Sequence, residues 1–275
     1  MSHRLLVLDV DGTLLRRDGT IHPDDHAAIA GLRARGVPVS IATGRLYSGT
    51  RGVARSIALT GPIACVDGSH IVGLEDDGEL VSHAITGADA LALRSIVARS
   101  GAASFLFAQD SIVHDSAGLP FAGYVKTWSP NIAYVDRALD HENWEHAAGV
   151  MAVVAIGGEA EIKAAVSSIE GELGHAARTV IFPVSRIERY AMVIRAAGPT
   201  KGTAIAWLAK HHGLTPADVV VVGDWINDVP MFEVAGRSFA MGQAPAEVKA
   251  KATDHLEADG HEGGGVAEAI RRAWG

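Results

Sequence analysis

The sequence predicts an α/β protein with a doubly wound parallel sheet and a second α/β unit inserted into it. Strand-like apolar runs alternate with helix-like segments along the 275 residues. The first run, Leu-Leu-Val-Leu at residues 5–8, is as apolar as a central parallel strand covered on both faces. Residues 83–186 have strand and helix patterns of their own. We therefore expect a core of residues 1–82 and 187–275 and an inserted α/β unit of residues 83–186.

The elements of the core follow from its apolar runs and its breakers. Pro23 is expected to open a helix that Gly36 ends, and Asp18-Gly19 is typical of a hairpin turn. Residues 201–212 have apolar side chains at helical spacing, and Gly213 is expected to end that helix. The strands of the core are expected at residues 5–8, 37–42, 63–66, 219–222 and 238–241, with a last helix after residues 263–265.

The inserted unit has a different pattern, with shorter apolar runs and more glycine and proline. Its helices are expected at residues 87–99 and 159–173, and its strands at residues 104–107, 112–114, 150–156 and 179–182. Residues 190–195 are expected to lead back toward the core. This pattern indicates a small sheet that is separate from the parallel one.

Composition limits the class of function. The chain is 48% hydrophobic and 20% charged, as a globular protein is. A net charge of -8 argues against nucleic acid as a partner, although a cation and local donors would still allow a small anionic ligand. The residues after Met1 lack the basic stretch and long apolar run of a signal peptide, so we expect none, and no apolar stretch is long enough for a membrane. The single Cys65 fits a reducing compartment. We therefore expect a cytoplasmic protein with no membrane partner, and the oligomeric state stays open.

Two carboxylates follow the first strand directly. In extended chain, residues two apart point the same way, so Asp9 and Asp11 can share one site. Crowded carboxylates repel each other unless a cation or a proton separates them. The pair indicates a metal site, an acid–base couple, or both. In phosphate chemistry, Asp9 could act as the nucleophile and Asp11 as the general acid and base.

The ends of other predicted core strands also carry groups that suit a phosphate. Thr43 and the backbone at Gly44 can donate hydrogen bonds to phosphoryl oxygens. Lys201, at a predicted helix start, supplies a point charge for a phosphate. Because ligands of open α/β sheets bind beyond the carboxyl ends of the strands, we expect these groups to meet there.

The last polar group follows the most apolar run of the chain. Asp224, with Asn227 and Asp228 close behind it, offers hard oxygen ligands for Mg²⁺. Gly12 and Gly223 would let the backbone approach closely. Together with Asp9 and Asp11, these residues predict a magnesium-dependent site for a phosphorylated small molecule.

Four segments of the sequence together resemble the motifs of one protein family. The order and the approximate spacing of four segments resemble the four motifs of the haloacid dehalogenase superfamily of phosphohydrolases, and the large insertion resembles its Cof-like branch with an α/β cap. The matching segments are Asp9-Val10-Asp11-Gly12-Thr13, Ala42-Thr43-Gly44-Arg45, Lys201-Gly202 and Gly223-Asp224-Trp225-Ile226-Asn227-Asp228. Each motif alone is weak, whereas four in order are specific, and the resemblance covers essentially the whole chain.

The resemblance implies a role for each matching residue. Asp9 would be the nucleophile that becomes an aspartyl-phosphate, and Asp11 the general acid and base. Thr43, Gly44 and Lys201 would hold the phosphoryl group. Asp224 would bind Mg²⁺ together with the two N-terminal aspartates, and Asp228 would support the metal, with Asn227 and Gly12 as supporting residues. The implied activity is hydrolysis of a small phosphomonoester such as a sugar phosphate, with the inserted unit as the specificity domain.

The chain departs from the family pattern at positions next to the site, among them the residues near Asp259-Gly260, where an expected Asn is missing. Relatives of this branch usually have Asn-Gly-Ala after the third strand, where this chain has Asp67-Gly68-Ser69. They usually have Met-Gly-Asn-Ala where this chain has Met241-Gly242-Gln243-Ala244. These changes leave the core motifs intact and put the substrate and the rate in question.

Two other functions stay open at this stage. A phosphomutase of the same fold would return the phosphoryl group to the substrate instead of passing it to water. A non-catalytic phosphate-binding or signalling module would also place acidic residues, a threonine and a lysine at strand ends. Such modules are shorter and have no inserted unit, and the presence of Asp11 favours turnover.

Overall fold

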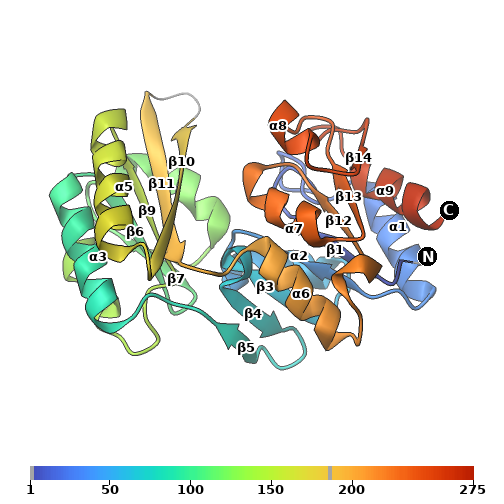
Figure 1. Cartoon of the computed structure of the whole chain (residues 1–275), viewed down its shortest axis with the longest axis horizontal. Helices are drawn as coiled ribbons and strands as arrows, with labels where there is room; N and C mark the ends of the chain where they lie inside the picture. The colour runs from blue at the N-terminus through green and yellow to red at the C-terminus, as the bar shows by residue number, and fades with distance from the viewer. Residues whose placement is uncertain (1–2, 185–187) are drawn as a thin grey trace. The chain divides into compact units, whose positions relative to one another are not determined.

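The computed structural model describes residues 3–184 and 188–275, and the chain divides into two compact units. Unit 1 takes in the chain up to Gly44, Arg51–Val81 and Pro199–Gly275. Unit 2 consists of Arg45–Thr50 and Ser82–Gly198. The boundary expected between residues 186 and 187 lies outside the described residues. Figure 1 shows the elements of each unit.

Unit 1 is built on a parallel sheet of five strands in the order β14-β13-β12-β1-β2. The central strand β1 pairs with β12 on one edge, where Leu5 faces Val219, and with β2 on the other, where Leu6 faces Val39. The five strands are Leu5–Leu8 (β1), Val39–Ile41 (β2), Val219–Gly223 (β12), Arg237–Ala240 (β13) and Asp254–His255 (β14). This sheet confirms the predicted α/β fold class, with β1 as a central strand.

Helices cover both faces of the parallel sheet, as the apolar runs require. Leu5 and Val7 of β1 pack in one hydrophobic cluster with residues of α6, such as Ile205, and of α7, such as Met231. Alternate residues of a strand face opposite ways, and α1 and α9 lie together on the other face (Figure 1). The helices of this unit are Pro23–Ala34 (α1), Lys201–His211 (α6), Val229–Val234 (α7), Ala246–Lys249 (α8) and Gly265–Trp274 (α9), and Tyr47–Ser56 (α2) starts in the segment grouped with unit 2.

Asp25 of α1 ties the two ends of the chain together. Its side chain is buried, and its Oδ1 and Oδ2 accept the backbone N–H groups of Ala267 and Gly264 at 2.7 and 2.9 Å. These N–H groups belong to the first turn of α9 and to the residue before it, where no intrahelical acceptor exists. Burial raises the pKa of Asp25, although the two backbone hydrogen bonds oppose this shift.

The third predicted core strand lies in a smaller sheet of its own. β3 (Pro62–Cys65) pairs antiparallel with β4 (His70–Gly73), and β5 (Glu79–Ser82) is the third strand of that sheet. A single parallel bridge between Ala42 and Ala64 joins β3 to the residue after β2. Strand β4 is short and follows directly after the turn at residues 66–68, so no separate apolar run in the sequence predicts this hairpin partner.

Unit 2 contains the separate small sheet that the sequence predicts. Its six strands run in the order β10-β11-β9-β6-β7-β8 and pair antiparallel, except for the parallel pair β7–β8. Helices α3 and α5 pack their apolar residues, such as Leu93 and Ile162, against residues of this sheet, such as Leu106. The elements are Gly87–Ser100 (α3), Ala103–Ala108 (β6), Ser111–His114 (β7), Ala122–Val125 (α4), Ile132–Tyr134 (β8), Ala152–Gly157 (β9), Glu159–Leu173 (α5), Ala177–Val184 (β10) and Arg189–Ala196 (β11).

Strand β11 does not leave this unit as the sequence analysis expected of residues 190–195. It pairs with both β9 and β10, because its central residues Ala191, Met192, Val193 and Ile194 are apolar and are buried in the sheet. The remaining turns are single-turn 3-10 helices at Val66–Gly68 (η1), Leu119–Phe121 (η2), Lys126–Trp128 (η3), Ala138–Asp140 (η4), Glu142–Trp144 (η5), Pro216–Asp218 (η6) and Ile226–Asp228 (η7). Within the described residues, no helix is both long and apolar enough to cross a membrane.

Candidate functional site

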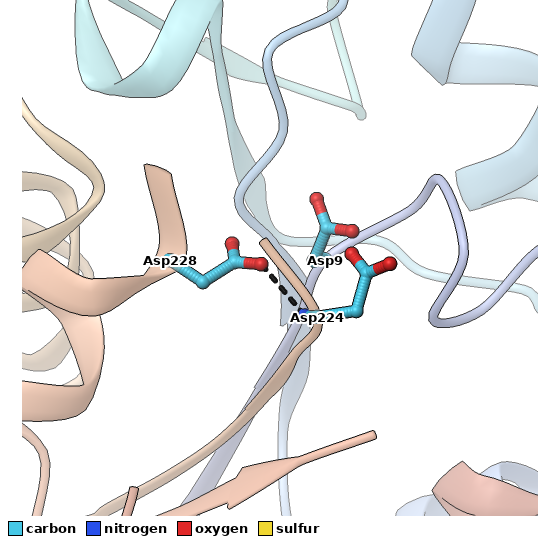
Figure 2. A group of neighbouring side chains, drawn as sticks. All are labelled: Asp9, Asp224 and Asp228. Atoms are coloured by element: carbon cyan, nitrogen blue, oxygen red, sulfur yellow. Dashed lines mark hydrogen bonds between the residues drawn. The ribbon is translucent and has the colours of Figure 1, made fainter. Parts of the chain in front are cut away.

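Three of the predicted carboxylates meet at the carboxyl end of the parallel sheet. Asp9 follows β1, Asp224 follows β12, and Asp228 ends the η7 turn. One side-chain oxygen from each lies within 4.8 Å of the others. Figure 2 shows the three carboxylates around one point, with the hydrogen bond from the Asp224 backbone N–H to Asp228. The adjacency of β1 and β12 therefore brings together residues that are more than 200 positions apart.

Lys201 supplies the cation of this cluster. It is the first residue of α6, and its side chain is completely buried. Its ammonium donates hydrogen bonds to Asp9 Oδ1 at 2.6 Å and to Asp228 Oδ1 at 2.5 Å. Thr200 caps the helix by accepting the N–H of Thr203, which fixes where the lysine leaves the backbone.

The charges of the cluster do not balance. Burial by itself would lower the pKa of Lys201, but the carboxylates of Asp228 and Asp9 raise it above its ordinary value. Burial raises the pKa of Asp9 well above its ordinary value; the charge of Lys201 opposes this rise, and the charges of Asp228, Asp224 and Asp11 add to it. Burial and the charge of Asp228 raise the pKa of Asp224 to about 7. Three carboxylates thus share one ammonium, and a divalent cation would neutralise the excess of negative charge.

The hydrogen bonds show which oxygens could hold such a cation. Asp228 Oδ1 accepts from Lys201, and its Oδ2 accepts from the backbone N–H groups of Asp224 and Trp225 at 2.8 and 2.9 Å. Among the described residues, Asp9 Oδ2 and Asp224 Oδ1 accept no hydrogen bond. Hard carboxylate oxygens are the ligands that Mg²⁺ prefers. The donor set therefore fits a divalent metal ion on Asp9 and Asp224, with Asp228 holding the lysine and the loop in place.

Two glycines allow this close approach. Gly12 has a φ of 77°, and a Cβ there would lie 2.4 Å from Asp224 Oδ2. A Cβ at Gly223 would lie 2.5 Å from the carboxylate of Asp228. Both positions need glycine because a carboxylate occupies the space of the missing side chain.

The other predicted site residues take different positions. Asp11 is exposed and is not part of the three-carboxylate group, although its charge raises the pKa of both Asp9 and Asp224. Thr43 is buried two residues after β2, and its backbone donates to Ala64 O and accepts from the N–H of Asp67. Gly44 follows it and is partly buried.

Two of the departures from the family pattern contact predicted site residues. Asp67 is buried and has a φ of 49°, and its Oδ1 accepts a hydrogen bond of 2.9 Å from Asn227 Nδ2. Gln243 donates to Asp224 Oδ2 and to Gly12 O. In the sequence, Asp67 and Gln243 are distinguished only by their departure from the family pattern. Their partners lie up to 231 residues away, so no local pattern could have assigned them a role.

Comparisons with known proteins show which family the chain belongs to. Residues 6–270 match the haloacid dehalogenase-like hydrolase family. The chain is 25% identical over 261 residues to the pyridoxal phosphate phosphatase YbhA of Escherichia coli, with 92% of each chain covered. A haloacid dehalogenase-like hydrolase from Bacteroides thetaiotaomicron has the same fold, with a TM-score of 0.83 at 22% identity over 99% of this chain and 100% of that one. A subclass IIB sugar phosphatase has it too, with a TM-score of 0.79 at 22% identity over 98% of each chain. The predicted resemblance is confirmed, and the chain belongs to the haloacid dehalogenase-like hydrolase family.

Proposed function

We propose that this protein is a Mg²⁺-dependent phosphatase that hydrolyses a small phosphomonoester through an aspartyl-phosphate on Asp9. By homology the chain is a phosphatase of the haloacid dehalogenase type, which implies a small phosphorylated molecule as its substrate. The observation that supports the metal-dependent mechanism is the cluster of Asp9, Asp224 and Asp228, in which Asp9 and Asp228 are buried and accept hydrogen bonds from Lys201. Its excess negative charge matches a divalent cation.

The first half of the reaction transfers the phosphoryl group to the protein. A carboxylate oxygen of Asp9 attacks phosphorus, and the bond from phosphorus to the leaving oxygen breaks. Asp11, as the carboxylic acid, donates its proton to that oxygen, so the product leaves as an alcohol. Because Lys201 holds Oδ1 of Asp9, the two oxygens of the nucleophile are not equivalent.

The second half releases phosphate. Water attacks the phosphorus of the aspartyl-phosphate, and the Asp11 carboxylate accepts the proton that the water loses. Asp9 is regenerated and inorganic phosphate departs. When bound, Mg²⁺ would neutralise charge on the transferring phosphoryl oxygens. Thr43, Gly44 and Lys201 are proposed to hold the same group, with Asn227 and Gly12 in support.

Two of the comparisons bear on the class of substrate. One relative is a pyridoxal phosphate phosphatase, and a solved structure of the same fold is a sugar phosphatase. We propose a sugar phosphate or a similar metabolite as the substrate and the cytoplasm as the location, which the single buried Cys65 supports. All of the proposed catalytic residues lie in unit 1, so we propose that unit 2, the cap, selects among leaving groups.

A screen of phosphorylated metabolites with Mg²⁺ tests the function, with an activated aryl phosphate as the positive control for the chemistry. We expect phosphate release with Mg²⁺ and none with EDTA. Asp9→Asn should abolish release, because the amide cannot form the phosphoenzyme. A product that keeps its phosphate at another position would instead support a phosphomutase. Equal phosphate release with Mg²⁺ and with EDTA would contradict the metal assignment.

The cap proposal has its own test. Replacing Ser82–Gly198 with a short Gly/Ser linker should leave some hydrolysis of the aryl phosphate and flatten the preference among natural phosphates. The shortened protein must still melt cooperatively for the comparison to count. If it kept the full substrate ranking of the intact chain, the cap would not be the specificity element.

A further inference from the structure

Gln243 makes contacts that are unusual for an exposed side chain. It follows β13 by three residues, and its amide joins three loops of unit 1. The amide nitrogen Nε2 donates to Gly12 O at 2.7 Å and to Asp224 Oδ2 at 3.0 Å. The amide oxygen Oε1 accepts from the backbone N–H of Gly260 at 2.8 Å.

The chemistry of these partners fixes the orientation of the amide. A backbone carbonyl and an ionised carboxylate are acceptors only, so they require the NH₂ end of the side chain. The backbone N–H of Gly260 is a donor only, so it requires the oxygen end. A flipped amide would lose all three hydrogen bonds, and each of the two amide hydrogens has one acceptor.

The surrounding backbone leaves little freedom for this arrangement. A Cβ at Gly260 would lie 2.5 Å from Gly12 O and 2.9 Å from Gln243 Nε2. A Cβ at Gly12 would lie 2.4 Å from Asp224 Oδ2 and 3.4 Å from Gln243 Nε2. The two glycines therefore pack directly against the amide and against its acceptors. The amide of Gln243 is therefore tightly packed, although the residue as a whole is exposed.

We propose that Gln243 is a positioning residue for the metal-binding carboxylate of Asp224. By holding Oδ2, the amide fixes the rotation of that carboxylate and leaves Oδ1 as the oxygen available to a cation. By holding Gly12 O, it also fixes the loop that carries Asp11. This inference rests on the proposed Mg²⁺ site. It gives Gln243, which stands where relatives usually have asparagine, the role of orienting the Asp224 carboxylate.

Mg²⁺ titration of the substrate-free protein by calorimetry tests the inference. Gln243→Met keeps the length of the side chain and removes the amide. We expect its Mg²⁺ affinity to fall by about 10- to 100-fold, the usual effect of losing a partner that orients a metal ligand. Gln243→Asn keeps an amide on a side chain one methylene shorter and should give an intermediate affinity. Gln109→Ala is the matched control, because Gln109 donates to Asn143 in unit 2, and its Mg²⁺ affinity should equal that of the unsubstituted chain.

Two further readouts separate positioning from general stability. Urea unfolding in EDTA should stay one cooperative transition for Gln243→Met, with a midpoint close to that of the unsubstituted chain, because the three lost hydrogen bonds belong to an exposed side chain outside the hydrophobic core. In turnover, Gln243→Met should need more Mg²⁺ to reach half of its own maximal rate, while KM for the ester at saturating Mg²⁺ stays constant. Unchanged Mg²⁺ affinity in Gln243→Met would overturn this inference alone. Failure of the unsubstituted chain to bind Mg²⁺ would overturn the proposed metal site and the inference with it.

Discussion

Replacing Lys201 with methionine should weaken unit 1 strongly in the absence of metal. Methionine fills nearly the same space, so the main change is the loss of the buried ammonium. At 2.6 Å and an effective dielectric constant of about 20, one ammonium–carboxylate pair is worth about 6 kcal/mol before any desolvation cost. Lys201 makes two such pairs, to Asp9 and Asp228, and their carboxylates would remain buried without a cation. Removing one partner of a buried pair typically costs about 3–5 kcal/mol after desolvation and proton uptake.

Mg²⁺ should reverse part of this loss, because it neutralises the same carboxylates. In EDTA, we expect the free energy of unfolding of Lys201→Met to fall by about 3–5 kcal/mol, which for a unit of this size lowers the melting temperature by roughly 6–20 °C. Adding Mg²⁺ should raise the melting temperature of the variant more than that of the unsubstituted chain. The assay is urea and thermal unfolding followed by circular dichroism, and the transition that responds to Mg²⁺ identifies unit 1.

A matched control isolates the effect of burial. Lys251 pairs with Glu233 at 3.3 Å in the same unit, with both side chains about half exposed. Lys251→Met should change the free energy of unfolding by less than about 1 kcal/mol, as is usual for a surface pair. If Lys201→Met in EDTA were no less stable than this control, the reasoning from buried charge would be refuted.

Three further predictions concern other aspartates. Asp11→Asn should slow hydrolysis of an ester with a poor leaving group by about a hundredfold or more, and steady-state kinetics in which such an ester kept its full rate would argue against an acid–base role. Asp67→Asn should leave KM unchanged or lower. The side-chain oxygen of asparagine can still accept the hydrogen bond from Asn227, and asparagine is one of the residues that adopt a φ of 49° most readily. A large rise in KM would show that the negative charge of Asp67 is needed. Asp25 has a pKa in the folded state that is raised above its ordinary value of 3.8. Between these two pKa values the folded state binds more protons than the unfolded state. The free energy of unfolding therefore falls as pH rises through this window. The stability of the unsubstituted chain relative to Asp25→Asn, measured by urea unfolding, should therefore decrease as pH rises through this window, and an increase would mean that the two backbone hydrogen bonds outweigh burial.

The sequence predicts most of the fold where a run of apolar residues is long or uninterrupted. Strands β1 and β12 consist of apolar residues up to the polar residues that follow them, so both the strands and the polar residues of the candidate site at their ends can be predicted. Helix α5 has the predicted bounds because its apolar spacing is regular and glycine precedes it. Strand β14 has only two residues, Asp254 and His255, and nothing in its composition distinguishes it from a loop.

The candidate site is readable only in part, for a physical reason. Aspartates at strand ends follow from the local pattern, whereas the partner of each polar group depends on which strands are neighbours. Asp228 shows the difference, because its position suggests a metal ligand, yet its two oxygens accept from Lys201 and from two backbone N–H groups. Gln243 is a second example. It is exposed in a loop, and its neighbours in the sequence do not predict its hydrogen bonds to Gly12 and Gly260.

The pairing of β1 on both of its edges has a consequence for biosynthesis. One edge of β1 finds β2 soon after synthesis, because Leu6 pairs with Val39. The other edge must wait for β12, since Leu5 pairs with Val219. At typical elongation rates of 5–20 residues per second, this wait is about 10–40 s. During that time a strand of four apolar residues has an unpaired edge in the nascent chain. Slowing or stalling translation within the inserted segment should therefore promote aggregation or chaperone capture of the N-terminal strands, even though the proposed catalytic residues that follow β1 are already made.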